Sequence, residues 1–162
     1  YHMKNTLGFT LLELIVALAV FAILSSLAVP SFLTWRNDAK LRSAGSMIRG
    51  DLEGARSRAM RENNFVSVLF NETNYSVFID DGEGAGNPGD YIRHADERLI
   101  INRQLPAGVT IDLTKTNFNG VDQTQFNGRG RIGRTGKVII VNSNGVERTI
   151  DADNRFGRIT VN

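Results

Sequence analysis

The sequence predicts an α+β fold in which one long N-terminal helix packs on an antiparallel β-sheet. Three features of the 162-residue chain lead to this prediction. The chain begins with a strongly apolar stretch, a helical repeat of apolar residues follows, and the part after residue 63 has the composition of strands and turns. Because that part contains no second helical pattern, the apolar face of the helix must cover the sheet.

The apolar stretch runs from Gly8 to Pro30 and contains one charged residue, Glu13. About 21 helical residues rise roughly 30 Å, which is the thickness of the hydrocarbon core of a bilayer. A carboxylate inside such a span costs about 2.5–3.5 kcal/mol on insertion scales, and charges inside membranes usually have a function. We therefore predict a transmembrane helix at residues 9–30 in which Glu13 has a specific role.

Two other interpretations stay open from these residues alone, a secretory signal peptide and a simple membrane anchor. A signal peptide has a basic flank, a short apolar run and a small-residue cleavage site after that run. Lys4 supplies a basic flank, but the apolar run is long and continues into a helical segment. In a simple anchor Glu13 would be protonated or would extend toward the membrane surface, and nothing would require it.

The helical pattern resumes after Pro30 and continues to about Asn63. Pro30 lacks an amide donor and clashes with the preceding turn, so we expect the helix to bend or melt locally there. The glycines at 45, 50 and 54 each cost a helix roughly 0.5–1 kcal/mol, which indicates close packing or local softness. Apolar residues recur every three, four or seven positions, on one helix face. They are Leu41, Ile48, Leu52, Ala55 and Ala59.

The remaining chain is predicted to form strands between turns. The predicted strands are 65–70, 75–79, 99–101, 109–113, 137–142, 146–151 and 156–161. The polar segment 114–125 is expected to be a loop, and the last three strands are expected to form an antiparallel meander. Residues 31–162 are therefore predicted to form one α+β domain.

Composition excludes several classes of function. The formal net charge of +2 is too small to indicate nucleic-acid binding by itself. Cysteine is absent, which excludes disulfides and thiolate metal sites. No phosphate-binding loop or Gly-x-Ser-x-Gly motif occurs, and His94 is expected to be a surface loop residue. We expect no enzymatic activity, no cofactor and no metal.

One acidic, glycine-rich segment, 80–90, contains carboxylates that could surround Ca²⁺, a cation that prefers oxygen ligands. The carboxylates are Asp80, Asp81, Glu83 and Asp90. Their spacing does not match an EF-hand loop. We therefore favour a solvated acidic loop and predict no calcium site.

The N-terminal residues resemble the leader of type IV prepilins. A short basic segment ends in Gly8, Phe9 follows, Glu13 is the fifth residue after that junction, and Pro30 stands where pilins often carry proline. The resemblance implies that residues 1–8 are a leader, of which the first two look like a cloning remnant. It also implies that prepilin peptidase cleaves between Gly8 and Phe9 and methylates the new amine of Phe9.

Four later segments are similar to the GspH/FimT group of pilin-like proteins, namely 51–60, 105–109, 126–130 and 157–159. The resemblance implies a minor pilin or minor pseudopilin, a low-copy subunit near the tip of a type IV pilus or a type II secretion pseudopilus. Its implied partners are other pilins or pseudopilins, prepilin peptidase and the bacterial inner membrane, which it spans once with a periplasmic domain. In such a filament Glu13 would pair with the cationic Phe9 amine of a neighbouring subunit, which offsets the burial of its charge and sets the axial register.

The segment after Gly120 is basic, and the same resemblance adds an alternative function, DNA binding by a competence minor pilin. Some FimT-type minor pilins bind DNA through a C-terminal Gly-Arg-x-Arg motif. Gly128-Arg129-Gly130-Arg131 has this spelling far from the C-terminus, and Gly157-Arg158-Ile159-Thr160 lies near it but lacks the second arginine. Arg129, Arg131 and Arg158 are therefore candidate DNA contacts. We favour a solvated sheet edge, because few aromatic residues interleave with the arginines.

Replacing Gly8 with leucine should make the unprocessed precursor accumulate, because a bulky side chain before the scissile bond hinders a peptidase at the membrane face. Mass spectrometry of the N-terminus from the native host measures the outcome, and the wild-type chain is expected to begin at an N-methylated Phe9. Gly8→Ala is the matched control, since its small side chain should hinder cleavage less. A mature N-terminus elsewhere, such as beyond Pro30, would contradict the prediction.

Overall fold

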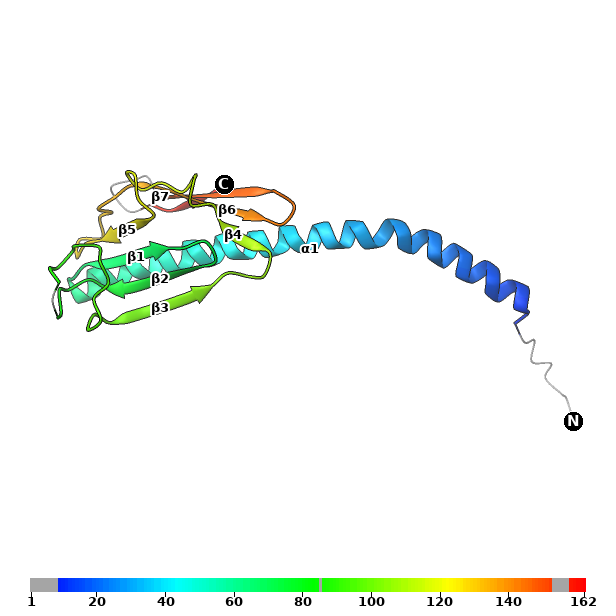
Figure 1. Cartoon of the computed structure of the whole chain (residues 1–162), viewed down its shortest axis with the longest axis horizontal. Helices are drawn as coiled ribbons and strands as arrows, with labels where there is room; N and C mark the ends of the chain where they lie inside the picture. Colours follow the sequence, from blue (N-terminus) through cyan, green and yellow to red (C-terminus); the bar gives the residue numbers. More distant parts are fainter. Residues whose placement is uncertain (1–8, 85, 153–157) are drawn as a thin grey trace, which may run out of the picture. The chain divides into compact units, whose positions relative to one another are not determined.

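The computed structural model describes residues 9–84, 86–152 and 158–162. The chain divides into two compact units, Tyr1–Arg36 and Asn37–Asn162. One helix, α1 (Leu11–Glu62), contributes residues to both units (Figure 1). We describe each unit by itself.

In the first unit, α1 continues unbroken through Pro30. The expectation of local melting at this proline is therefore wrong, and the blue part of the helix in Figure 1 curves without a break. Pro30 cannot donate to the carbonyl of Ser26, but its own carbonyl accepts a hydrogen bond from the hydroxyl of Thr34 at 3.2 Å. The flanking turns keep their backbone bonds, so the helix tolerates one missing donor.

The second unit contains two four-stranded antiparallel sheets, where the sequence predicted one. The first sheet has the order β3-β2-β1-β5 and comprises β1 (Val66–Phe70), β2 (Asn74–Ile79), β3 (Leu99–Gln104) and β5 (Gln123–Phe126). The second has the order β4-β6-β7-β8 and comprises β4 (Val109–Ile111), β6 (Gly136–Asn142), β7 (Glu147–Ala152) and β8 (Thr160–Val161). All neighbouring strands are antiparallel, as predicted.

Most predicted strands are confirmed, and the one that sequence reasoning missed is polar. The β1–β2 hairpin and the β6–β7–β8 meander lie where they were predicted, although residues 153–157 are outside the described chain. The expectation of a loop at 114–125 is wrong, because β5 begins within it. Thr124 and Gln125 are buried, and their side chains donate to the carbonyl of Arg134 and to Asp80. Hydropathy therefore gives no signal for this strand.

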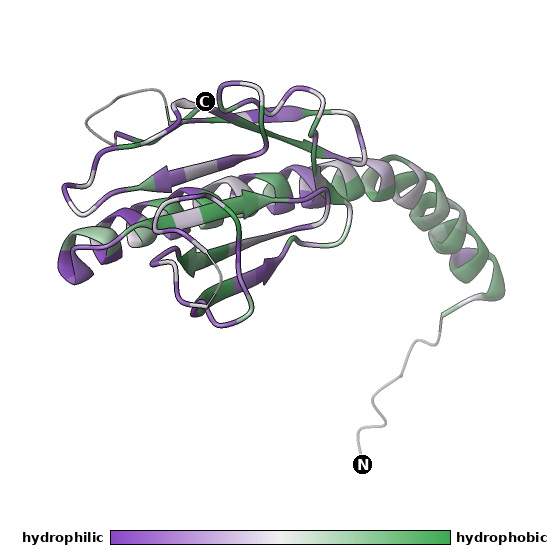
Figure 2. Cartoon of the chain, turned by 60° about the vertical axis from the view of Figure 1, so that its left-hand side comes forward, coloured by the Kyte–Doolittle hydropathy of each residue, from purple (hydrophilic) through white to green (hydrophobic). Residues whose placement is uncertain are grey.

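The apolar face predicted for the later part of α1 is confirmed as the centre of the core. Figure 2 shows this part of the helix alternating between hydrophobic and hydrophilic residues. Leu41, Ile48, Leu52, Ala55 and Ala59 are at most 3 % exposed, and Ala44 is fully buried beside them. The same core contains inward-facing residues of both sheets, among them Val66, Val68, Val77 and Phe126 of the first sheet and Ile111, Val138, Ile140 and Ile150 of the second. One face of the helix therefore packs against both sheets.

A polar contact connects α1 to the first sheet at the edge of this core. The phenol of Tyr75 in β2 donates to Asp51 of α1 at 2.5 Å, and Arg103 in β3 donates to both oxygens of that carboxylate at 3.0 and 3.1 Å. Burial raises the pKa of Tyr75 well above its ordinary value, and the adjacent Asp51 raises it further. The phenol therefore remains a hydrogen-bond donor near neutral pH and holds the helix in one rotation against β2.

The three helix glycines have different surroundings. Gly45 is buried, and a methyl group added there would lie 3.5 Å from Val161 and 3.6 Å from Ile140, so close packing is confirmed at this position. Gly50 and Gly54 are exposed, and an added methyl group at either would meet no described atom within 4 Å. The expectation of close packing is therefore wrong for Gly50 and Gly54. Both glycines destabilise the helix through their backbone entropy without allowing a closer contact.

Gly50→Ala and Gly54→Ala should each raise the free energy of unfolding by about 0.5–1 kcal/mol, because alanine is the better helix former and meets no obstacle. Urea unfolding of a fragment covering residues 37–162, which holds the whole core, measures the change. Gly136→Ala is a control with the opposite sign, since its methyl group would overlap the carbonyl oxygen of Asn117. Unchanged stability in both helix variants would contradict the assignment of these glycines.

Candidate assembly site

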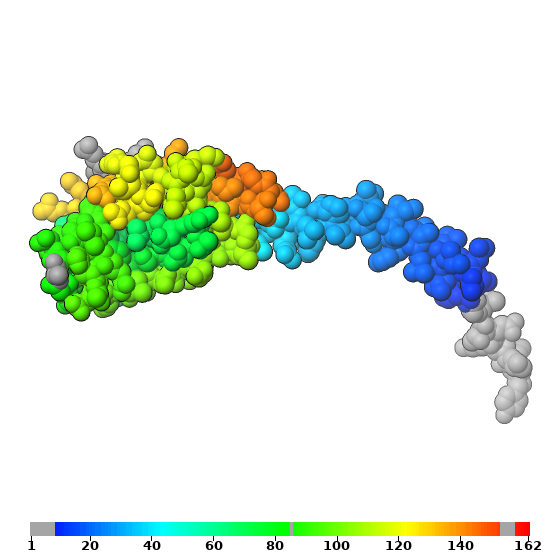
Figure 3. Space-filling view, in the orientation of Figure 1, coloured from blue at the N-terminus to red at the C-terminus, as the bar shows by residue number. Residues whose placement is uncertain are grey.

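Apolar side chains cover the surface of α1 in the first unit. Phe9 is 86 % exposed, Phe21 69 % and Leu27 73 %. Figure 3 shows the blue part of the chain uncovered, and none of its most apolar window is buried. By length and composition, α1 is the one helix among the described residues that could cross a membrane. An apolar surface this large is unfavourable in water, so lipid or other helices must cover it.

Glu13 lies in the first turn of α1 and takes part in a helix cap. The hydroxyl oxygen of Thr10 accepts a hydrogen bond from the backbone amide of Glu13 at 3.2 Å. Thr10 is thus the N-cap and Glu13 the third helical residue, which is the sequence spacing of a capping box, and the bond is made by the backbone of Glu13. A carboxylate at this end also interacts favourably with the helix dipole. Sequence reasoning missed this local role, although the spacing of the two residues signals it.

The other residues predicted for processing and assembly, Gly8, Phe9 and Pro30, do not form one site with Glu13 among the described residues. Gly8 lies outside the described residues, so the cleavage junction stays a prediction. Phe9 precedes the helix with its ring exposed. Pro30 lies roughly 25 Å further along α1 than Glu13 and shares no site with it in one subunit. A contact between Glu13 and the Phe9 amine of a neighbour would therefore join the N-terminal ends of two helices.

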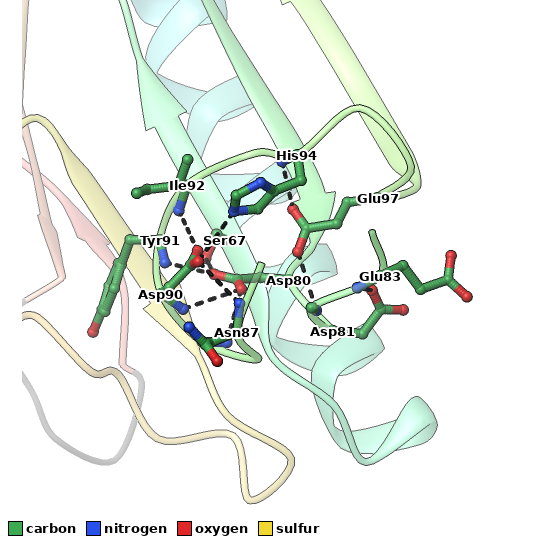
Figure 4. A network of polar contacts seen from close by, with 12 residues as sticks. Ser67, Asp80, Asp81, Glu83, Asn87, Asp90, Tyr91, Ile92, His94 and Glu97 are labelled. Atoms are coloured by element: carbon green, nitrogen blue, oxygen red, sulfur yellow. Dashed lines mark hydrogen bonds and ion pairs between the residues drawn. The ribbon is translucent and has the colours of Figure 1, made fainter. Parts of the chain in front are cut away.

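The buried carboxylate of Asp80 organises the loop that was considered for calcium (Figure 4). Its two oxygens accept five hydrogen bonds of 2.7–3.2 Å. The donors are the backbone amides of Gly89, Asp90 and Tyr91, the hydroxyl of Ser67 and the side-chain amide of Gln125. These donors occupy the acceptor sites of the carboxylate, which leaves no free oxygen for a cation. The prediction of a solvated loop is therefore wrong at Asp80.

Two further carboxylates fold this loop on itself. Glu97 is 2 % exposed and accepts hydrogen bonds from two loop amides. Asp90 accepts from the amides of Ile92 and Asn87, which lower its pKa, and it lies 3.1 Å from Nε2 of His94. In the described part of the chain, no group of three or more acidic, histidine or cysteine side chains could hold a metal ion. The buried carboxylates thus serve the fold of the loop.

The three arginines that were candidate DNA contacts are exposed, and they lie in two segments of the chain. Arg129 and Arg131 lie in a turn that the side chain of Asn127 closes by accepting from both of their amides at 3.0 Å. Arg129 borders a hollow of about 290 Å³ beside Phe65, whereas Arg131 borders a different hollow of about 350 Å³. Arg158 precedes β8, the edge strand of the second sheet.

Comparison with protein families gives two matches that together span most of the chain. The prokaryotic N-terminal methylation motif matches residues 3–29. The family described as type II transport protein GspH matches residues 44–157. No curated protein sequence matches the chain.

Solved structures share the fold of this chain at low sequence identity. The type IV minor pilin FimU of Pseudomonas aeruginosa PAO1 has a TM-score of 0.56 at 19 % identity, over 80 % of this chain and 92 % of that one. The minor pseudopilin EpsH of Vibrio cholerae has a TM-score of 0.56 at 8 % identity, over 76 % of this chain and 96 % of that one. These similarities confirm the predicted pilin-like α+β fold.

Asp80→Asn should lower the free energy of unfolding by about 1–3 kcal/mol, because asparagine offers one acceptor oxygen and leaves buried loop amides unpaired. Asp81→Asn is the matched control, since this neighbour is partly exposed and, within the described part of the chain, accepts just a local bond from the amide of Glu83. Urea unfolding with calcium or with a chelator measures both, and neither addition should change the curves. A calcium-dependent gain in stability that Asp80→Asn removes would instead indicate a metal site.

Proposed function

We propose that this chain, which belongs to the type II transport protein GspH family, is a minor pilin or minor pseudopilin. It joins a type IV pilus or a type II secretion pseudopilus through its N-terminal helix. FimU and EpsH, whose fold it shares, are a minor pilin and a minor pseudopilin. We accordingly assign it to the low-copy subunits near the tip of the filament.

The observation that carries this proposal is the contrast between the two parts of α1. From Leu41 to Ala59 one face of the helix is buried in a core, whereas the first unit exposes apolar residues all round. A helix that is apolar all round belongs in lipid or among other helices. A subunit that is first held in the inner membrane and then joins a filament would place this helix first in lipid and then among other helices.

Processing by prepilin peptidase supplies the charge that assembly requires. Residues 3–29 match the N-terminal methylation motif, and cleavage after Gly8 would free the amine of Phe9 within it. This amine is largely cationic near neutral pH. The processed chain would cross the inner membrane once and hold residues 31–162 in the periplasm.

Glu13 is the acceptor that we assign to this amine. In an isolated subunit, the cap with Thr10 stabilises the first turn, and the helix dipole favours the carboxylate there. In a bundle of apolar helices the carboxylate is withdrawn from water and requires an opposite charge. The Phe9 amine of the adjoining subunit supplies that charge. Because both groups have fixed positions along their helices, the pair also sets the axial register.

The alternative, DNA binding in a competence pilus, has weaker geometric support. Arg129 and Arg131 border different hollows, which share Asn127 in their lining, and Arg158 lies just before β8 of the second sheet. DNA binding without base contacts depends on many phosphate contacts along a basic surface. Filter binding with the fragment of residues 37–162 at several salt concentrations tests this alternative. Salt-dependent binding that is lost when Arg129 and Arg131 become alanine would favour it.

Glu13→Ala should insert into the membrane at least as well as the wild type but should enter filaments poorly. Insertion improves because an intramembrane charge is gone. Incorporation falls because the neighbouring amine loses its partner, and an unpaired buried charge costs about 3–5 kcal/mol. The measurement is the amount of processed subunit in sheared or purified filaments, relative to the amount in the membrane.

Two further variants separate charge from helix capping in this experiment. Glu13→Gln keeps the size of the side chain and the Thr10 cap but removes the charge, so it should fail as Glu13→Ala does. Thr10→Val removes the cap and keeps the charge, so it should assemble nearly normally. If Thr10→Val fails while Glu13→Gln assembles, the defect belongs to the cap and the register contact is wrong.

A further inference from the structure

Two aromatic side chains stand at the end of the apolar part of α1. Trp35 is the one tryptophan of the chain, and it is 59 % exposed. Phe32 is 57 % exposed on the preceding turn, and the two ring centroids lie 5.9 Å apart at an interplanar angle of 33°. No described residue accepts a hydrogen bond from the indole N–H of Trp35. The pair is therefore large and apolar, with the polar N–H of the indole at one edge.

The position of this pair along the helix matches the edge of a bilayer. At 1.5 Å per residue, Pro30 lies about 31 Å from Phe9, which is the thickness of the hydrocarbon core. On the same scale Phe32 lies about 3 Å and Trp35 about 8 Å beyond Pro30. The headgroup region adds roughly 5–7 Å on each side of the core. Phe32 therefore falls within that region and Trp35 at its outer edge, so neither residue lies inside the core.

The residues after Trp35 show how far along the helix the membrane can extend. Arg36 is exposed, and the second unit begins at Asn37. Asp38 accepts a hydrogen bond from Asn142 at 2.8 Å, and Lys40 donates to the carbonyl of Ala107 at 2.9 Å. These polar side chains are thus engaged in the folded second unit. The boundary between lipid and water must lie before them.

We propose that Phe32 and Trp35 form an aromatic anchor for the lipid–water interface of the membrane, with the indole N–H donating to a headgroup oxygen or to interfacial water. Tryptophan is enriched at this depth because it has an apolar body and a polar edge. The anchor fixes how deeply the subunit is stored before assembly. This inference rests on the membrane-inserted state in the proposed function, and it adds the position of the outer boundary.

The fluorescence of Trp35 tests the anchor without a label, since the chain has no other tryptophan. The full-length processed protein is reconstituted at low density in vesicles whose acyl chains carry bromine either near the headgroup or near the bilayer centre. Trp35 should be quenched several-fold more strongly by the shallow bromine than by the deep one. The reference is Phe21→Trp combined with Trp35→Phe, which moves the fluorophore to mid-span and should reverse this order.

A second measurement tests whether Trp35 is held at the interface or lies there merely because the helix has the length of this bilayer. In vesicles with shorter or longer acyl chains, an anchored Trp35 keeps its shallow position because the helix tilts or the bilayer adjusts. Stronger quenching by the deep bromine, quenching by aqueous acrylamide alone, or a depth that changes with thickness would each overturn the anchor. If the mid-span reference is also reached only by acrylamide, the helix is not in the membrane, and the proposed function fails together with the anchor.

Discussion

The buried face of α1 between Leu41 and Ala59 is the constraint on which the soluble unit depends. Leu41, Ile48 and Leu52 are each at most 2 % exposed, and burial of such a side chain contributes about 1.5–3 kcal/mol. The two sheets have separate strand orders and share no paired strands. Each sheet has an apolar inner face, and both faces meet the same helix in one core. Without the helix, neither four-stranded sheet would have a partner layer.

Directed polar contacts, both at the edge of the core and in its cover, determine the rotation and position of elements that hydrophobic burial alone leaves free. An apolar helix face can slide or rotate against a sheet at small cost, but the Asp51–Tyr75–Arg103 contact has one geometry. The outer face of the first sheet is fixed in a similar way, since Asp80 gathers the loop amides and the guanidinium of Arg134 lies 3.7 Å above the ring of Tyr91. The loop is therefore held by directed bonds rather than by an apolar core of its own.

The sequence predicted what depends on periodicity and turn chemistry. The helix face and the end of α1 followed from the spacing of apolar residues and from Asn63, which adopts a φ of 48° just after the helix. β5 was not predictable from hydropathy, because the burial of Gln125 depends on a partner, Asp80, that is distant in the sequence. For the same reason Asp80 resembled a solvated acid. The division into two sheets is likewise a matter of long-range pairing, which local patterns do not contain.

The candidate site was predictable in part for a related reason. Glu13 is conspicuous because a charge interrupts an apolar stretch, and this contrast is visible in one segment. Its capping contact with Thr10 is also local, yet the apolar background directs attention to the membrane and away from helix caps. The two roles are compatible in the proposed function. The helix dipole lowers the cost of a carboxylate at the start of a membrane helix, and in the proposed filament the same position would bring it within reach of a neighbour's N-terminus. A charge deeper in the span would not interact with the helix dipole, and its burial in lipid before assembly would cost more free energy.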